Sequence, residues 1–201
     1  MESRLIDMEN LKLLKVESPE KGAEHVFRII KEELENGRLH VLGLATGSTM
    51  IPVYKEWAAS DLDFSDVTSF NLDEYVGLSA SNPNSYAYFM EKHLFAKKKF
   101  KETHIPNGTA PDLDKECADY EALLLKYPLD IQLLGTGENG HIAFNEPGTP
   151  FDSVTHVAQL TESTLGVNSQ YFENDEKIPE TALSMGITSI LRAKKLILLA
   201  F

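Results

Sequence analysis

Residues 129–150 read LDIQLLGTGENGHIAFNEPGTP, and this stretch begins with a short apolar run that ends at Gly135. Four apolar side chains within six residues, bounded by a glycine, are typical of a buried strand that delivers a loop to one edge of a sheet. Gly135, Gly137 and Gly140 lie within six residues of one another. Glycines at this density free the backbone for positive φ and allow a ligand to approach closely. The stretch therefore predicts a central strand and a loop that carries a site.

The loop after this strand carries Glu138, Asn139, His141 and Glu146. Histidine titrates nearest neutrality, and a nearby carboxylate can fix its tautomer and raise its basicity. A His/Glu pair beyond a strand end therefore indicates a proton-transfer unit. The alternative is a glycine-rich turn in which both side chains are only solvated, because short patterns are weak evidence. A metal site at these acids and His141 is disfavoured, since no second His or Cys stands at ligand spacing.

The composition sets limits on the class of protein. A chain of 201 residues fits one domain with a substantial core, and its net charge of -12 repels nucleic acids and anionic membranes. Any phosphate must then be held locally, by backbone amides and a few placed cations. Cys117 is the single cysteine, so no intrachain disulfide can form. No signal-peptide pattern and no run of about 18 apolar residues is present, and we expect a cytosolic protein.

The amino-terminal part of the chain predicts a strand, a helix and a second strand. Residues 11–16 read as the first strand, and residues 18–20, Ser-Pro-Glu, supply a cap, a first-turn proline and a first-turn acid. The helix then carries apolar side chains at helical spacing and stops near Gly37. Residues 39–45, LHVLGLA, form the next strand. This order predicts a right-handed βαβ unit in a parallel sheet.

A small, hydroxyl-rich turn follows this second strand. It comprises Thr46, Gly47, Ser48 and Thr49, and a predicted helix with Pro52 in its first turn comes next. Free amides and the helix dipole at such a helix start can bind an anion. The turn lacks the lysine of a nucleotide-binding P-loop. The alternative is a Ser/Thr helix cap that binds no ligand.

Residues 67–78, VTSFNLDEYVGL, repeat this design as a strand that ends in the polar residues Asn71, Asp73 and Glu74. In an open parallel sheet the carboxyl ends of the strands line one crevice, so Asp73 is placed to face His141 across it. We interpret Asp73 as a partly desolvated base. The alternative is that it caps a turn or a helix.

Later segments complete the predicted scaffold. Residues 85–95 are predicted to be helical, and a second helix packs Cys117 on one face together with Leu125. A helix over residues 160–172 would place Asn168 and Gln170 on one side. Residues 195–201, KLILLAF, predict a strand that is buried on both faces.

Four motifs together identify a family. GLATGST, FNLDEYVGL, HIPNG and above all GENGHIAFNEPGTPF resemble the glucosamine-6-phosphate deaminases, in order and with compatible spacing, over residues 16–201. The resemblance implies an α/β fold with a Rossmann-like open, mainly parallel sheet and helices on both faces. It also implies a single sugar-phosphate isomerase-like domain over residues 1–201 that lacks the family's C-terminal segment.

The resemblance gives roles to individual residues. Asp73 would take a proton from C2 of the open-chain sugar and return it to C1. His141 would move the proton that opens the pyranose ring, with Glu146 and Asn139 orienting or tuning it. Some family members carry Asp where this chain has Asn139. No metal or organic cofactor is implied.

The resemblance also implies contacts with an amino-sugar phosphate, in a monomer or a homo-oligomer that binds neither nucleic acid nor membrane. The implied contact residues are Thr46, Gly47, Ser48 and Thr49 as a cradle for the 6-phosphate, together with Gly137 and Gln170. Many relatives carry an arginine where Gln170 stands, so the cationic grip on the phosphate would be weaker here.

Three other readings stay open. A 6-phosphogluconolactonase shares the fold and a Gly-His loop, but its loop continues with Thr-Ala-Ser-Leu-Phe-Pro instead of the Ile-Ala-Phe-Asn-Glu-Pro found here. A galactosamine-6-phosphate deaminase would share every motif. A non-catalytic sugar-phosphate sensor is the third alternative, and the joint presence of Asp73, His141 and Glu146 argues against it.

Overall fold

The central sheet consists of five parallel strands in the order β10-β7-β3-β4-β6. The computed structural model describes residues 5–8, 11–137, 139–172 and 178–201. The strands are β3 (Val41–Leu44), β4 (Phe64–Asn71), β6 (Phe100–His104), β7 (Ile131–Gly135) and β10 (Lys195–Leu199). This arrangement confirms the predicted α/β class with an open, mainly parallel sheet.

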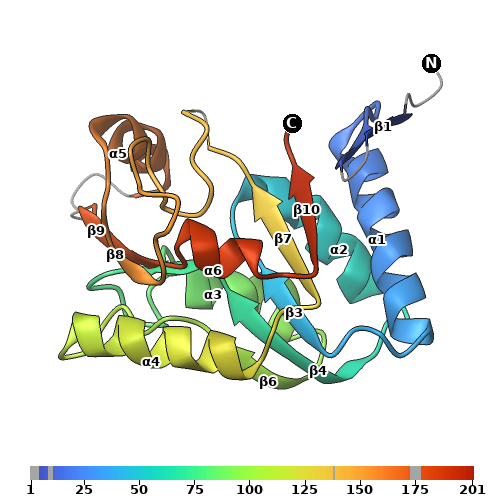
Figure 1. Cartoon of the computed structure of the whole chain (residues 1–201), viewed down its shortest axis with the longest axis horizontal. Coiled ribbons are helices and arrows are strands. Elements are labelled where there is room, and N and C mark those ends of the chain that lie inside the picture. The colour runs from blue at the N-terminus through green and yellow to red at the C-terminus, as the bar shows by residue number, and fades with distance from the viewer. Residues whose placement is uncertain (1–4, 9–10, 138, 173–177) are drawn as a thin grey trace.

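Helices cover both faces of this sheet (Figure 1). They are α1 (Pro19–Glu35), α2 (Ile51–Ala59), α3 (Tyr86–Met90), α4 (Leu113–Lys126) and α6 (Ile187–Leu191). The chain runs from β3 through β4 to β6 in one direction along the sheet, and from β7 to β10 in the other. Right-handed crossovers therefore place α2 and α3 on one face and α4 and α6 on the opposite face.

A second, antiparallel sheet stands beside the carboxyl ends of the central strands. Its order is β5-β9-β8, formed by β5 (Asp73–Tyr75), β9 (Thr181–Ser184) and β8 (His156–Gln159). A single residue, Leu72, separates β4 of the central sheet from β5 of this one. The short helix α5 (Glu162–Asn168) follows β8. The stretch 67–78, predicted as one strand, is thus divided between two sheets.

The start and end of α1 follow from local sequence signals. The Ser18 side chain accepts a hydrogen bond from the Lys21 amide at 3.3 Å, and Pro19 occupies the first turn. Past the end of the helix, Gly37 adopts a φ of +62°, a left-handed conformation that suits glycine. The predicted cap, proline and stop are all confirmed.

The first predicted strand does not belong to the central sheet. It is β2 (Leu11–Leu14), which pairs antiparallel with β1 (Leu5–Met8) in a two-stranded hairpin. Leu11 and Leu13 are 60% and 55% exposed, so the hairpin does not bury these side chains. The predicted βαβ unit over residues 11–45 is therefore wrong, and the parallel sheet begins at β3.

Two predictions of burial are also wrong. β10 is an edge strand of the sheet, and Leu196 and Leu198 are exposed although Leu199 is buried. On α4, Cys117 is buried as expected, whereas Leu125 is 59% exposed. An apolar run predicts a strand or helix but carries no information on which of its faces another element covers.

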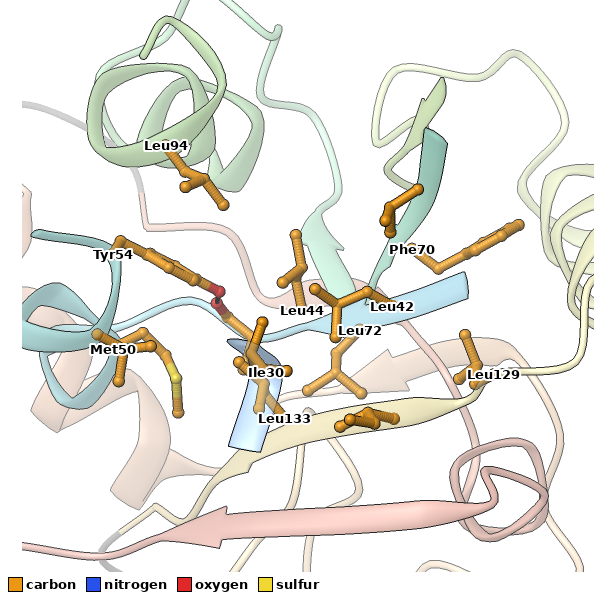
Figure 2. Packing of buried hydrophobic residues seen from close by; sticks show 14 of the residues in the cluster. Ile30, Leu42, Leu44, Met50, Tyr54, Phe70, Leu72, Leu94, Leu129 and Leu133 are labelled. Carbon is orange, nitrogen blue, oxygen red and sulfur yellow. Dashed lines mark hydrogen bonds between the residues drawn. The ribbon is translucent and has the colours of Figure 1, made fainter. Parts of the chain in front are cut away.

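A continuous apolar core lies between the central sheet and its helices, and Ile30 of α1 and Leu133 of β7 are two of its fully buried members (Figure 2). Tyr54 of α2 is fully buried, and its hydroxyl donates a hydrogen bond to the Ala45 carbonyl at 2.5 Å. This bond fixes α2 to the carboxyl end of β3. In the described part of the chain no helix is both long enough and apolar enough to span a bilayer.

Candidate active site

The candidate residues gather where the order of the strands reverses. β3 and β7 are neighbours in the sheet, but the chain leaves them in opposite directions. In open α/β sheets ligands bind in the crevice at this switch point, beside the carboxyl ends of the strands. A Cβ on Gly135, at the end of β7, would lie 3.9 Å from the Met50 side chain, just after the Thr46–Thr49 turn. The two predicted loops therefore adjoin each other.

The turn after β3 presents its backbone at the start of a helix. Gly47 has a φ of +95°, and a 3-10 turn over Ser48–Met50 leads into α2. No side chain of the described residues caps either helical segment. The alternative of a Ser/Thr cap without a ligand therefore does not hold, and the amides of this turn remain available for an anion.

The loop after β7 folds back tightly on itself. The Gly137 amide donates to the His141 carbonyl at 3.0 Å, and Gly140 adopts a φ of +86°. A Cβ on Gly137 would lie 2.2 Å from Cε1 of the His141 ring. Glycine is therefore required at position 137 so that the imidazole can pack against the backbone. Its role as a substrate contact stays a prediction, and Glu138 lies outside the described residues.

Asn139, His141 and Glu146 come together as the sequence predicts. Asn139 Nδ2 donates to Glu146 Oε2 at 2.8 Å, and its Oδ1 accepts from the His141 amide at 3.1 Å. His141 Nδ1 lies 3.6 Å from Glu146 Oε2. Asn139 thus orients both the carboxylate and the backbone of the histidine. The alternative of a solvated turn does not hold, because Glu146 is only 8% exposed.

Two threonines that sequence reasoning missed complete this cluster. Thr164 Oγ1 donates to Glu146 Oε1 at 2.5 Å and lies 3.5 Å from His141 Nδ1. Thr161 caps α5 through a hydrogen bond from the Thr164 amide, and its own amide lies 3.4 Å from Glu146 Oε1. The Thr-x-x-Thr spacing is a signal for the start of a helix, but it does not indicate that Glu146 lies beside it.

The electrostatics of the cluster favour a neutral imidazole and an ionised carboxylate. Burial lowers the pKa of His141, and the charge of Glu146 opposes this shift only in part. Burial alone would raise the pKa of Glu146, but hydrogen bonds from Thr164 and Asn139, together with His141, hold that pKa below its ordinary value. A neutral histidine can both accept and donate a proton near neutral pH.

Asp73 lies at the first position of β5 and is 6% exposed. Burial, and secondarily the charge of Glu74, raises the pKa of Asp73 to about 8. The alternative role as a cap belongs instead to Glu74, whose carboxylate accepts the amides of Tyr75, Tyr86 and Ala87 at 2.8–2.9 Å. Among the described residues nothing donates a hydrogen bond to the Asp73 carboxylate, which leaves it available for a substrate.

β9 connects Asp73 to the loop that carries His141. Asp73 pairs with Ser184 of β9, and the Ser184 hydroxyl accepts a hydrogen bond from the Phe144 amide at 3.1 Å. The Asn145 side chain donates to the Met185 carbonyl at 2.8 Å. Within the described residues no direct hydrogen bond or ion pair joins Asp73 to His141. The two groups are therefore positioned through a shared strand and not through a mutual contact.

Gln170 is exposed in the 3-10 turn Ser169–Tyr171 that follows α5, and its Nε2 donates to the Val167 carbonyl at 2.9 Å. The structure does not bring it into contact with the Thr46–Thr49 turn, so its role as a phosphate contact stays a prediction. The described residues contain no group of three or more His, Cys, Asp or Glu side chains that could hold a metal ion.

Known proteins resemble this chain over nearly its whole length. The profile of the family described as "Glucosamine-6-phosphate isomerases/6-phosphogluconolactonase" matches residues 15–201. A glucosamine-6-phosphate deaminase from Enterococcus faecalis is 56% identical over 191 residues, which is 95% of this chain and 82% of that protein. One from Lactobacillus johnsonii is 54% identical, with 95% and 80% of the two chains covered.

Solved structures agree with the sequence matches. A monomeric glucosamine-6-phosphate deaminase superposes with a TM-score of 0.87 at 42% identity, covering 91% of this chain and 79% of that one. A 6-phosphogluconolactonase from Trypanosoma brucei superposes with a TM-score of 0.73 at 20% identity, covering 91% and 79%, and shares the fold. The chain belongs to the glucosamine-6-phosphate isomerase/6-phosphogluconolactonase family.

Proposed function

We propose that this chain is a glucosamine-6-phosphate deaminase, which converts glucosamine 6-phosphate and water to fructose 6-phosphate and ammonia. The observation that carries the proposal is that a buried, uncapped carboxylate, Asp73, and the loop with the His141–Glu146 unit are both held by the same strand, β9. Relatives named for this activity, at 54–56% identity over 95% of the chain, support it.

Ring opening is the first step, and we assign it to His141. The neutral imidazole takes the proton of the C1 hydroxyl and delivers a proton to the ring oxygen, so that the C1–O5 bond breaks and C1 becomes an aldehyde. The lowered pKa of His141 keeps the ring neutral for this task, and Glu146 stabilises the imidazolium that forms in between.

Isomerisation and deamination follow. The Asp73 carboxylate removes the proton from C2, and the resulting enolamine is reprotonated by the same group at C1. The bond from C2 to nitrogen is then an imine, to which water adds before ammonia leaves and C2 becomes a ketone. With its pKa raised to about 8, Asp73 is a stronger base than an ordinary carboxylate, and the fraction of molecules in which it is ionised near neutral pH can remove a carbon-bound proton.

The 6-phosphate would bind at the Thr46–Thr49 turn. Its uncapped amides lie at the start of the nine-residue helix α2, where the helix dipole favours an anion. The net charge of -12 repels a phosphate at long range, so the free energy of binding must come from this local site. Gln170 would contribute an uncharged hydrogen bond to the phosphate, whereas an arginine at this position would contribute a positive charge.

We also propose where the enzyme works and in which oligomeric state. A sugar phosphate is an anion that does not cross membranes unaided, so we place the enzyme in the cytosol, as a single domain over residues 1–201. Its amino-sugar phosphate is the one small-molecule partner that we assign, and we propose a monomer or a homo-oligomer. Light scattering coupled to size-exclusion chromatography distinguishes these two states.

The first test is to incubate the purified chain with glucosamine 6-phosphate and to measure ammonia and fructose 6-phosphate together. We expect equal amounts of both products from the wild type. The variant Asp73→Asn should abolish exchange of the C2 proton with solvent while still binding the substrate in isothermal titration. Binding by the wild type without release of either product would support a sensor, and hydrolysis of 6-phosphogluconolactone would support the lactonase instead.

A further inference from the structure

Thr164 occupies the point where α5 meets the proton-transfer unit. It is 3% exposed, and its hydroxyl lies within 3.5 Å of polar atoms from three other residues, Thr161, Glu146 and His141. A buried hydroxyl surrounded by a carboxylate and an imidazole is placed to control both of them. The Thr164 hydroxyl carries one hydrogen and can donate to one partner only, so the direction of each of these hydrogen bonds can be deduced.

The hydroxyl proton of Thr164 is committed to the carboxylate. Thr164 Oγ1 donates to Glu146 Oε1, and the Thr161 hydroxyl donates to Thr164 Oγ1 at 3.2 Å. Thr164 can therefore offer only its lone pairs to the imidazole. His141 Nδ1 then faces two acceptors, Thr164 Oγ1 at 3.5 Å and Glu146 Oε2 at 3.6 Å.

An imidazole nitrogen that faces two acceptors carries the proton in the neutral ring. These separations are long for hydrogen bonds, and catalytic contacts of this kind shorten when substrate binds. His141 Nε2 has no hydrogen-bond partner in the part of the chain that the structure describes. The neutral ring would thus present an unprotonated Nε2, the form that is needed to accept a proton from a sugar hydroxyl.

We propose that Thr164 is a positioning residue that orients Glu146 and fixes His141 in the Nδ1–H tautomer. The consequence for turnover rests on the proposed function of His141 in ring opening, whereas the tautomer itself does not. Because Thr164 belongs to α5, the placement of that helix determines whether the imidazole is in its active form. The helix and the proton-transfer unit are then coupled through the Thr164 hydroxyl, which makes a shorter contact with Glu146 than the Thr161 amide does.

The direct test is the tautomer of His141, measured by nitrogen-15 NMR of the imidazole in the free protein and assigned with His141→Gln. We expect the wild type and Thr164→Ser, which keeps the hydroxyl, to show the Nδ1–H form. Thr164→Val is nearly isosteric but lacks the hydroxyl, and it should show a mixture of both tautomers. An unchanged Nδ1–H signal in Thr164→Val would overturn the proposal.

A matched control separates this effect from simple loss of stability. Thr155 is also buried, and its Oγ1 donates to the Glu121 carboxylate at 2.7 Å, in a cluster that contains none of the proposed catalytic residues. Thr155→Val removes the same kind of hydrogen bond and should lower the melting temperature without altering the His141 spectrum. A change of tautomer in this variant would show that the effect is not specific to Thr164.

Kinetics supply the second readout. Thr164→Val should lower kcat roughly tenfold, the effect of losing one hydrogen bond to a charged group, while KM stays within about twofold. Thr164→Ser should restore most of kcat. If Ser and Val impair turnover equally, the hydroxyl has no positioning role. If the wild type itself releases no ammonia, the proposed function fails, yet the NMR experiment still decides the role of Thr164.

Discussion

Replacing Asp73 with asparagine should make the protein more stable at neutral pH while removing its proposed base. Asp73 is 6% exposed, and its pKa is raised from 3.8 to about 8 in the folded state. Between pH 3.8 and about pH 8, Asp73 is protonated in the folded chain but has lost its proton in the unfolded chain. Stability therefore falls as pH rises through this interval, by about 1.4 kcal/mol for each pH unit.

Asparagine is neutral at every pH and does not carry this penalty. From about pH 5.5 to about pH 7.5, the difference in unfolding free energy between Asp73→Asn and the wild type should grow by about 2.5 kcal/mol in favour of the variant. Urea denaturation at both pH values measures this difference. The change of this difference with pH is more informative than the unfolding free energy at one pH. Any effect of the amide on stability that does not depend on pH cancels from it.

Asp66→Asn is the control for this experiment. Asp66 is an exposed residue of β4, so the same substitution there removes no buried carboxylate. The pH-dependent gain in stability expected for Asp73→Asn should be absent from this variant. If the difference for Asp73→Asn stays constant, burial does not raise the pKa of Asp73, and the argument that it is a stronger base than an ordinary carboxylate fails.

Three further predictions concern the loop after β7 and the end of α5. Gly137→Ala should lower kcat/KM by about 100-fold, because its Cβ would displace the His141 ring, whereas Gly166→Ala, with open space around the added Cβ, should leave activity unchanged. Gln170→Arg should lower KM by roughly tenfold at low salt and by less at high salt, and an unchanged KM would remove residue 170 from the phosphate site. His141→Gln should slow turnover of the cyclic sugar, and a pre-opened analogue should recover part of the rate; no recovery would assign ring opening elsewhere.

Local signals made much of the fold predictable from the sequence. The cap, proline and glycine around α1 act within a few residues, so the sequence is sufficient to place its ends. The strands β3 and β7 are short apolar runs bounded by glycine-containing turns, and both were predicted with their loops. The proximity of Asn139, His141 and Glu146 is equally local, because all three lie within eight residues of one another.

Features that depend on distant partners were not predictable in this way. The pattern of residues 11–16 shows a strand, but pairing with β1 instead of β3 depends on how the whole chain packs. β10 has the composition of a central strand, and its place at the edge is fixed by the order of crossovers. Thr164 becomes important only when α5 folds against a loop 18 residues earlier in the sequence.

The single residue between β4 and β5 has a mechanical consequence. Leu72 joins a parallel sheet to an antiparallel one, and one residue is too short to absorb a rotation of one sheet against the other. Any such rotation must move the Asp73 carboxylate with it. The position of the proposed base therefore depends on the placement of the whole second sheet, including its edge strand β8, so that substitutions on β8 can tune the proposed reaction without touching the crevice.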